Sequence, residues 1–209
     1  MKRFRVAFLL PLLLVSGQPQ ASAPAKERPL VKALTFNGQA FDDVADALHI
    51  KKKSGQIQLN AVNFGGGLQI DFYRQGKQLP RSIKFGTMLV EDQPRVPHQL
   101  DFCVHIIDMD YLLLSGGKKD HCRIHLKLGE KGSAMWSDED LPKTVFDFSK
   151  VTASGRFRTI ANSKEKIPLF WFLAKTNVIN SFSDTVEQLI ANNKDCDVAV
   201  ISLTLADAK

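Results

Sequence analysis

Apolar and polar residues alternate along much of this chain, which is the pattern of strands with one buried side. The alternation is clearest in Gln56–Ala61 and in Leu68–Tyr73. Between them, Asn63–Gly67 contains three consecutive glycines, which tolerate the positive φ angles of tight turns. The pattern therefore predicts that the two segments pair as a β-hairpin.

Further segments have strand-like patterns, and clusters of turn-forming residues separate several of them. The predicted strands are Leu30–Phe36, Ser82–Val90, Gln99–Ile107, Met109–Leu114, Cys122–Leu128, Thr144–Phe148, Arg156–Ala161 and Asp197–Leu205. The predicted turns are Gln75–Lys77, Glu91–Pro94, Ser115–Gly117 and Ser154–Gly155.

Two segments have helical signals. Phe41–His49 carries an apolar stripe at i, i+3, i+4 and i+7 spacing, and Asp184–Asn192 opens with Asp184 as N-cap and Glu187 three residues later. Ile167–Ala174 fits either a fully buried strand or a core helix. Many short strands with one or two short helices predict a mainly β fold, an antiparallel β-sandwich or barrel-like single domain.

The segment from 105 to 128 predicts a hairpin with a defined register. If Leu114 lies opposite His121, one face pairs Ile107 with Leu128, Met109 with Leu126, Tyr111 with Ile124 and Leu113 with Cys122. The other face then pairs Asp110 with His125. Upstream, the apolar residues fall on even numbers, so the change of parity predicts a β-bulge near Ile106 and Ile107.

The N-terminus has the three parts of a secretory signal peptide. Lys2, Arg3 and Arg5 precede an apolar stretch of ten residues, Val6–Val15, and small residues follow up to Ala25. A membrane-spanning helix needs about 20 apolar residues. We therefore expect residues 1–25 to be a cleaved signal and residues 26–209 to be one exported β-rich domain, periplasmic or secreted, without a membrane span.

Removal of that signal changes the charge of the protein. The net charge is +6, and losing the three basic residues Lys2, Arg3 and Arg5 with no acidic residue lowers it to +3. Such a charge is ordinary for a small domain. Together with export, it argues against nucleic acid as a partner.

The three cysteines are Cys103, Cys122 and Cys196. In an oxidising compartment, one disulfide and one free thiol are expected. The predicted bulge turns Cys103 away from Cys122, so a bridge between Cys122 and Cys196 is predicted, with three unpaired thiols as the alternative. None of the three has a sequence setting that indicates a catalytic nucleophile.

Four histidines cluster in the sequence at positions 98, 105, 121 and 125, with aspartates nearby. On a strand, His121 and His125 lie about 13 Å apart, too far to share a metal ion. His125 and Asp110, opposite each other in the predicted register, are the one candidate metal-ligating pair, and a surface ion pair explains them equally well. No cofactor is predicted.

Trp136 is the best single candidate for a contact residue, because it is a large aromatic in a predicted loop beside the acidic run Ser137–Asp140. Packing over a sheet edge is the alternative explanation. Lys118 and Lys119 form a basic loop that could meet an acidic partner or an anionic polymer, although charged residues at strand ends often serve solubility.

No motif places a serine, histidine and acid together as a hydrolase requires. We therefore expect a non-enzymatic, exported β-sandwich that works by binding. Recognition of another envelope or secreted protein is the first hypothesis, as an inhibitor, an immunity-type protein or an accessory subunit. Binding of envelope carbohydrate or peptidoglycan through Trp136 is the second, and an undetected hydrolase or metalloprotein is the third.

Overall fold

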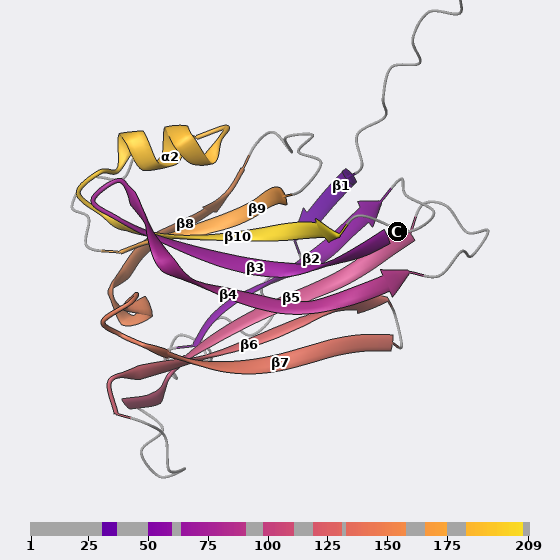
Figure 1. Cartoon of the computed structure of the whole chain (residues 1–209), viewed down its shortest axis with the longest axis horizontal. Helices are drawn as coiled ribbons and strands as arrows, with labels where there is room; N and C mark the ends of the chain where they lie inside the picture. The colour runs from indigo at the N-terminus through magenta and orange to yellow at the C-terminus, as the bar shows by residue number, and fades with distance from the viewer. Residues whose placement is uncertain are drawn as a thin grey trace, which may run out of the picture.

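Two antiparallel sheets of five strands each face one another in the computed structural model of the chain (Figure 1). The structure describes residues 31–36, 50–59, 64–90, 98–110, 119–130, 133–157, 166–174 and 183–206. Sheet A has the order β1 (Val31–Phe36), β2 (Ile50–Leu59), β5 (His98–Asp108), β6 (His121–Glu130) and β7 (Ser133–Pro142). Sheet B has the order β4 (Lys77–Val90), β3 (Phe64–Arg74), β10 (Asp197–Ala206), β9 (Lys166–Ala174) and β8 (Val151–Arg156).

The predicted β-sandwich is therefore confirmed, and the sheets remain two separate layers rather than a barrel. The core lies between them and follows from the period-two alternation, because every second side chain of a strand points inward. Large apolar side chains from both sheets fill it without exposed surface, among them Ile57, Phe72, Leu100, Ile124 and Phe170.

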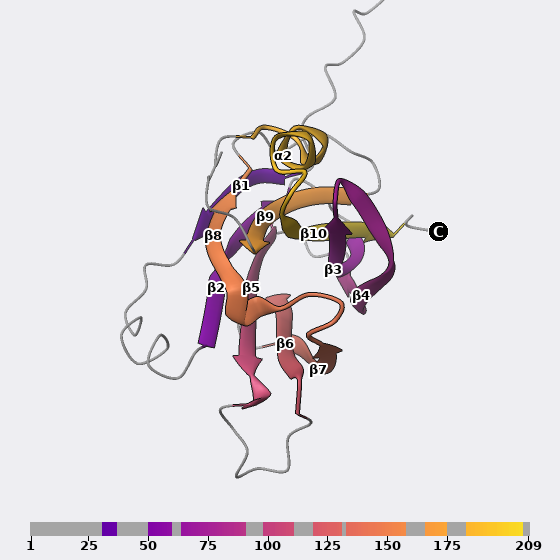
Figure 2. The same cartoon turned by 90° about the vertical axis from the view of Figure 1, so that its left-hand side faces the viewer.

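The outer side of sheet B is covered by the helix α2 (Val186–Asn192), and Figures 1 and 2 both place α2 on the side of sheet B that faces away from β6 and β7. A second apolar cluster joins Leu189 of α2 to Trp171 and Leu173 of β9 and to Val198 of β10. Strand β9 is thus buried on both sides, which explains the unbroken apolar run that fitted either a strand or a helix.

The hairpin predicted between Gln56–Ala61 and Leu68–Tyr73 is wrong. Both segments lie in strands, but β2 pairs with β1 and β5 in sheet A, whereas β3 pairs with β4 and β10 in sheet B. The connection crosses between the layers. Sequence alternation shows that a segment is a strand with one buried side, but it does not show which of the two sheets the strand joins.

The hairpin of β5 and β6 exists in a different register from the predicted one. Ile106 lies opposite Ile124 and Val104 opposite Leu126, and the register is continuous from Asp101 to Asp108 without the predicted bulge. The inward positions stay even-numbered up to Asp108, a buried carboxylate that interrupts the apolar pattern. His125 consequently lies opposite His105, and the predicted pairing with Asp110 is wrong.

Several predicted elements differ from the structure. Met109 and Asp110 form a short 3-10 turn, and Thr144–Phe148 runs through a turn into the 3-10 helix η2 (Phe148–Lys150) instead of a strand. Ser154–Gly155, predicted as a turn, lies inside β8. The helix predicted over Phe41–His49 and the turns at Glu91–Pro94 and Ser115–Gly117 lie outside the described residues.

Other local predictions are confirmed, or differ from the structure by one residue. Gln75 and Gly76, both at positive φ, make the predicted turn between β3 and β4. Helix α2 starts one residue later than predicted, because the hydroxyl of Thr185, rather than Asp184, accepts from the Gln188 backbone N–H at 3.2 Å. Gln188 in turn accepts from the Asp184 backbone N–H.

The predicted Cys122–Cys196 disulfide is absent, since all three cysteines are free thiols. Cys122 faces the core between the sheets, whereas Cys196 packs in the cluster under α2, on the other side of sheet B. A sheet therefore lies between the two sulfur atoms. Cys103 points away from Cys122, as predicted, but through plain strand alternation rather than a bulge.

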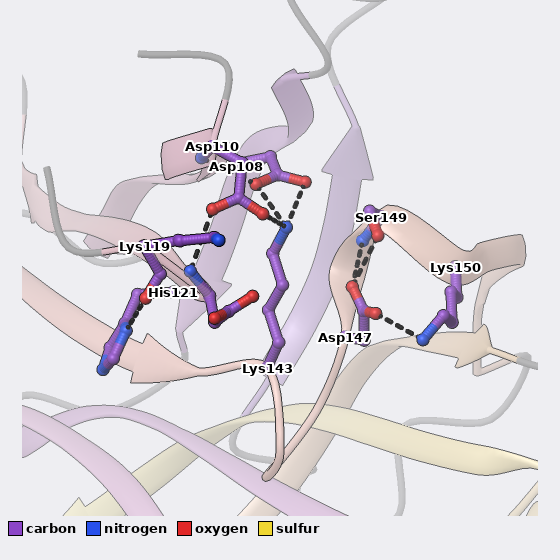
Figure 3. Close-up of polar contacts among 9 residues, drawn as sticks. Asp108, Asp110, Lys119, His121, Lys143, Asp147, Ser149 and Lys150 are labelled. Carbon is purple, nitrogen blue, oxygen red and sulfur yellow. Dashed lines mark hydrogen bonds and ion pairs between the residues drawn. The ribbon is translucent and has the colours of Figure 1, made fainter. Parts of the chain in front are cut away.

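One lysine contacts two aspartates at the end of sheet A where both β5 and β7 stop, beside the start of β6 (Figure 3). Lys143 Nζ lies 2.6 Å from Asp108 Oδ1 and 2.7 Å from Asp110 Oδ2. The backbone N–H of Asp120 donates to Asp110 at 2.9 Å, which also fixes the entry to β6. Because Asp108 is almost fully buried, these contacts compensate a carboxylate that has lost its water.

Candidate functional site

The outer face of sheet A is the side of β2, β5, β6 and β7 that points away from sheet B. Alternation places charged and polar side chains on it, because the apolar partners of the same strands point into the core. Its described polar members are half-buried or exposed, among them Lys52, Ser54, Gln56, Asp101, Cys103, His105, Arg123, His125, Lys127, Trp136, Asp138 and Asp140. The apolar Ile50 and Ile107, which lie opposite each other near one end of the face, are half-buried as well.

A hollow of about 480 Å³ opens on this face above β5 and its two neighbouring strands. Most of its lining residues have hydrogen-bonding side chains, among them Lys52 and Gln56 of β2, Asp101, Cys103 and His105 of β5, and Lys127 of β6. The strand register brings these residues together, since Lys52 lies opposite His105 and Lys127 opposite Cys103. The volume falls within the range of small-ligand sites.

Three aromatic rings extend from this hollow towards the edge of the sheet. His105 and His125 stack with their ring centroids 5.9 Å apart, and His125 stacks with Trp136 at 6.1 Å. Asp138 Oδ1 lies 2.7 Å from His125 Nδ1 and fixes the orientation of that ring. Trp136 is held from one side by His125, and its side chain remains 67% exposed. A flat apolar ring is thus presented to solvent in a fixed orientation.

Cys103 and His105 are in contact on the floor of the hollow, with Sγ 3.1 Å from Nε2. Burial raises the pKa of the Cys103 thiol, although the positive charges of Lys52 and Lys127 partly offset that effect. Burial, the charge of Lys52 and the neighbouring His125 lower the pKa of His105. At neutral pH both groups are therefore uncharged, which favours hydrogen bonding over attack by a thiolate.

The charged residues of this face fall into two groups. Arg123 Nε lies 3.0 Å from Asp140 Oδ1, and His125 is paired with Asp138. Within the described part of the chain, no ion pair involves Lys52 or Lys127. The two lysines that border the hollow thus form no ion pair among these residues, although the carboxylate of Asp101 lines the same hollow.

The predicted contact residues are not brought together. The side chain of Trp136 is exposed, but Trp136 lies in strand β7 rather than in the predicted loop. Lys119 is exposed in the turn before β6, next to His121 (Figure 3), and Trp136 lies opposite Lys127 near the other end of β6. About 20 Å of strand separate them. Lys118 lies outside the described residues.

The metal candidates His125 and Asp110 also lie apart. Asp110 is bound by Lys143 at the end of β5, whereas His125 faces His105 and Asp138 in the middle of sheet A. In the portion of the chain that the structure describes, no group of three or more His, Cys, Asp or Glu side chains is arranged to hold a metal ion.

The sequence prediction did not place Cys103, His105, Lys52 and Lys127 on the same face as Trp136. A signal for two of them was present, because Asp101, Cys103 and His105 alternate with the apolar residues at 100, 102 and 104. That alternation places all three on the outer side of β5. Their position next to Lys52 and Trp136 depends on the order β2-β5-β6-β7, which the sequence pattern did not reveal.

Comparison of the chain with known protein families, curated proteins and solved structures found no significant match. Among the described residues, no helix combines the length and the apolar character needed to cross a membrane. The chemistry of the outer face of sheet A is therefore the basis on which a function can be proposed.

Proposed function

We propose that this chain is an exported, non-enzymatic binding protein that recognises an envelope carbohydrate or peptidoglycan through the outer face of sheet A. One observation carries the proposal: Trp136, 67% exposed and oriented by His125, lies on the same face as a hollow of about 480 Å³ with hydrogen-bonding walls. A sugar ring has an apolar face that can stack on an aromatic ring, and its hydroxyl groups match polar side chains.

The composition of the face favours a saccharide over a protein partner. The centre of a protein interface is apolar and poor in Lys and Asp. Here Trp136 is surrounded by Lys127, His125 and Asp138, and the other exposed large hydrophobic among the described residues, Met135, points towards β4 instead. The geometry thus supports the second of the two ligand classes expected from the sequence.

Protein recognition remains the second candidate because of the position of strand β7. It is an edge strand of sheet A, and it carries both exposed large hydrophobic residues, Met135 and Trp136. An edge strand can pair with a strand of another protein, and exposed apolar side chains on it would add to such an interface. Under this alternative, both residues contact the partner.

The substitutions Trp136→Ala and Met135→Ala test the two candidates. We expect Trp136→Ala to weaken binding of the exported protein to isolated envelope polysaccharide or peptidoglycan about thirtyfold, as loss of a central aromatic contact does. Met135→Ala, one residue along the same strand, should leave that binding unchanged. Co-sedimentation with the insoluble polymer measures both variants.

Two results would contradict the saccharide proposal. Equal sedimentation of Trp136→Ala and the unchanged protein would remove Trp136 from the binding site. Recovery of a stoichiometric envelope protein that both substitutions release, without bound glycan, would favour recognition through the β7 edge.

A further inference from the structure

We propose that the hollow beside Trp136 selects saccharides that carry a carboxylate, and that Lys52 and Lys127 bind this group. The inference rests on the proposed function and names the chemical class of the ligand: an acidic polysaccharide of the uronate type rather than a neutral one.

The two lysines approach the hollow from opposite sides. Lys52 is on β2 and Lys127 is on β6, and β5 runs between these strands. Neighbouring strands lie about 4.8 Å apart, so the two backbones are separated by roughly 10 Å across the sheet. Both side chains line the hollow, and the charges of both act on the Cys103 thiol at its floor. Their positive potential is therefore centred over Cys103.

Asp101 is the one carboxylate among the residues that line the hollow, so it compensates only part of the charge of the two lysines. Arg123 and His125 on the same face have carboxylate partners in Asp140 and Asp138. In the described residues, neither Lys52 nor Lys127 has an ion pair. A ligand carboxylate placed between the two lysines would supply the missing negative charge. Gln56 and Asp101, which also line the hollow, offer a donor and an acceptor for adjacent hydroxyl groups.

The expected selectivity is moderate because the site is open to water. Two partly exposed ion pairs correspond to about a tenfold preference for an acidic over a neutral saccharide. Screening by salt should reduce this preference, since exposed charges are screened within about 10 Å at an ionic strength of 0.1 M. Stacking on Trp136 depends little on salt and should persist.

The rate at which the Cys103 thiol is alkylated measures whether the hollow is occupied. Cys103 is the one partly exposed cysteine of the three, because Cys122 and Cys196 are buried. A thiol reagent applied to the native protein should therefore modify Cys103 first. A saccharide bound between Lys52 and Lys127 covers this thiol and should slow its modification.

The test compares a polyuronate with the same polymer after reduction of its carboxyl groups to alcohols. Both are titrated into the exported protein at low and at high salt, and binding is followed by calorimetry and by protection of Cys103 from alkylation. The variants are the double substitution Lys52→Gln/Lys127→Gln and the control Lys77→Gln, an exposed lysine at the start of β4 in the other sheet.

We expect the polyuronate to bind about tenfold more tightly than its reduced form at low salt. The double substitution should abolish this difference and high salt should reduce it, while Lys77→Gln preserves it. The double variant should bind the two polymers equally, and a urea midpoint equal to that of Lys77→Gln would show that it is folded. The protection of Cys103 from alkylation should rank the polymers and variants in the same order as their binding affinities.

Two different failures are distinguishable. Equal, Trp136-dependent binding of both polymers would overturn the carboxylate inference and leave the proposed saccharide function intact. If neither polymer binds or protects Cys103, the inference is overturned for uronates and the saccharide function loses its main support.

Discussion

At the scale of single residues, the outer side of β5 combines groups whose protonation is controlled by their surroundings. Cys103 and His105 are both partly buried, and each is placed near the charge of Lys52. Trp136 illustrates what sequence alone could predict here. A large aromatic in a polar segment indicated exposure, but its orientation by His125 results from a strand pairing that was not predicted.

The lowered pKa of His105 predicts a contribution to the pH dependence of stability. Burial, Lys52 and His125 hold this pKa below the ordinary value of 6.5, so the unfolded chain binds a proton more readily than the folded protein does. Protonation therefore favours unfolding, and the free energy of unfolding falls as the pH drops through 6.5 towards the folded-state pKa.

The substitution His105→Asn removes this group, and we expect it to reduce the loss of stability between about pH 7.5 and pH 5. Urea unfolding at both pH values measures the effect, and the difference from the unchanged protein isolates His105 from the other histidines. An identical loss in both proteins would contradict the assigned environment of His105.

At the scale of elements, polar contacts hold the ends of strands that the hydrophobic pattern alone does not fix. Lys143 follows β7 and binds Asp108 and Asp110 at the end of β5 (Figure 3). The carboxylates of Asp108 and Asp110 raise the pKa of Lys143 despite its burial, so it stays charged over the physiological range. The contact joins strands that are not neighbours in sheet A.

Replacement of Lys143 by methionine should destabilise the protein by about 3 kcal/mol, because it leaves the buried carboxylate of Asp108 without its cation. Lys150→Met is the matched control. Its ammonium pairs with Asp147 at 2.8 Å, but the side chain is 58% exposed, so the expected change is under about 0.5 kcal/mol. Chemical denaturation measures the free energy of unfolding of both variants. Equal losses would show that the ion pairs of Lys143 with Asp108 and Asp110 do not stabilise the fold.

Close packing of β8 on β9 gives the second prediction at this scale. A Cβ atom at Gly155 would overlap Cζ2 of Trp171, which is fully buried beneath α2. Gly155→Ala should therefore cost about 2 kcal/mol through overpacking. Ser154→Ala, at the neighbouring exposed position, should change the stability little. If both variants melt at the same temperature as the unchanged protein, β8 is not packed on Trp171 in this way.

The sequence predicted the positions of the strands better than the way in which the strands pair. Alternation located the strands β2, β3, β5, β6 and β10, since their buried sides are strongly apolar. It failed for β7, because an edge strand with acidic residues resembles a loop. It also failed for the register of β5 and β6, where the buried Asp108 interrupted the pattern and shifted the apparent parity. Strand pairing depends on contacts between distant segments, which local patterns do not contain.

At the scale of the whole molecule, the two outer faces of the sandwich differ. Helix α2 covers sheet B over an apolar cluster, whereas the outer face of sheet A carries polar side chains, a hollow and an exposed tryptophan. The sequence predicted the sandwich and named Trp136 as a candidate contact, but only the strand order places Lys52, Cys103 and Lys127 on the same face as that ring. The proposed binding function follows from this asymmetry.

The most direct test of the account is the fluorescence of Trp136 during titration with envelope polysaccharide. The chain has two tryptophans, and Trp171 is fully buried, so quenching by iodide reports mainly on Trp136. The account predicts that saturating polysaccharide protects Trp136 from iodide, in the unchanged protein and in Met135→Ala alike. Unaltered quenching at saturating concentrations of polymer, with the protein folded, would contradict the claim that the outer face of sheet A binds saccharide.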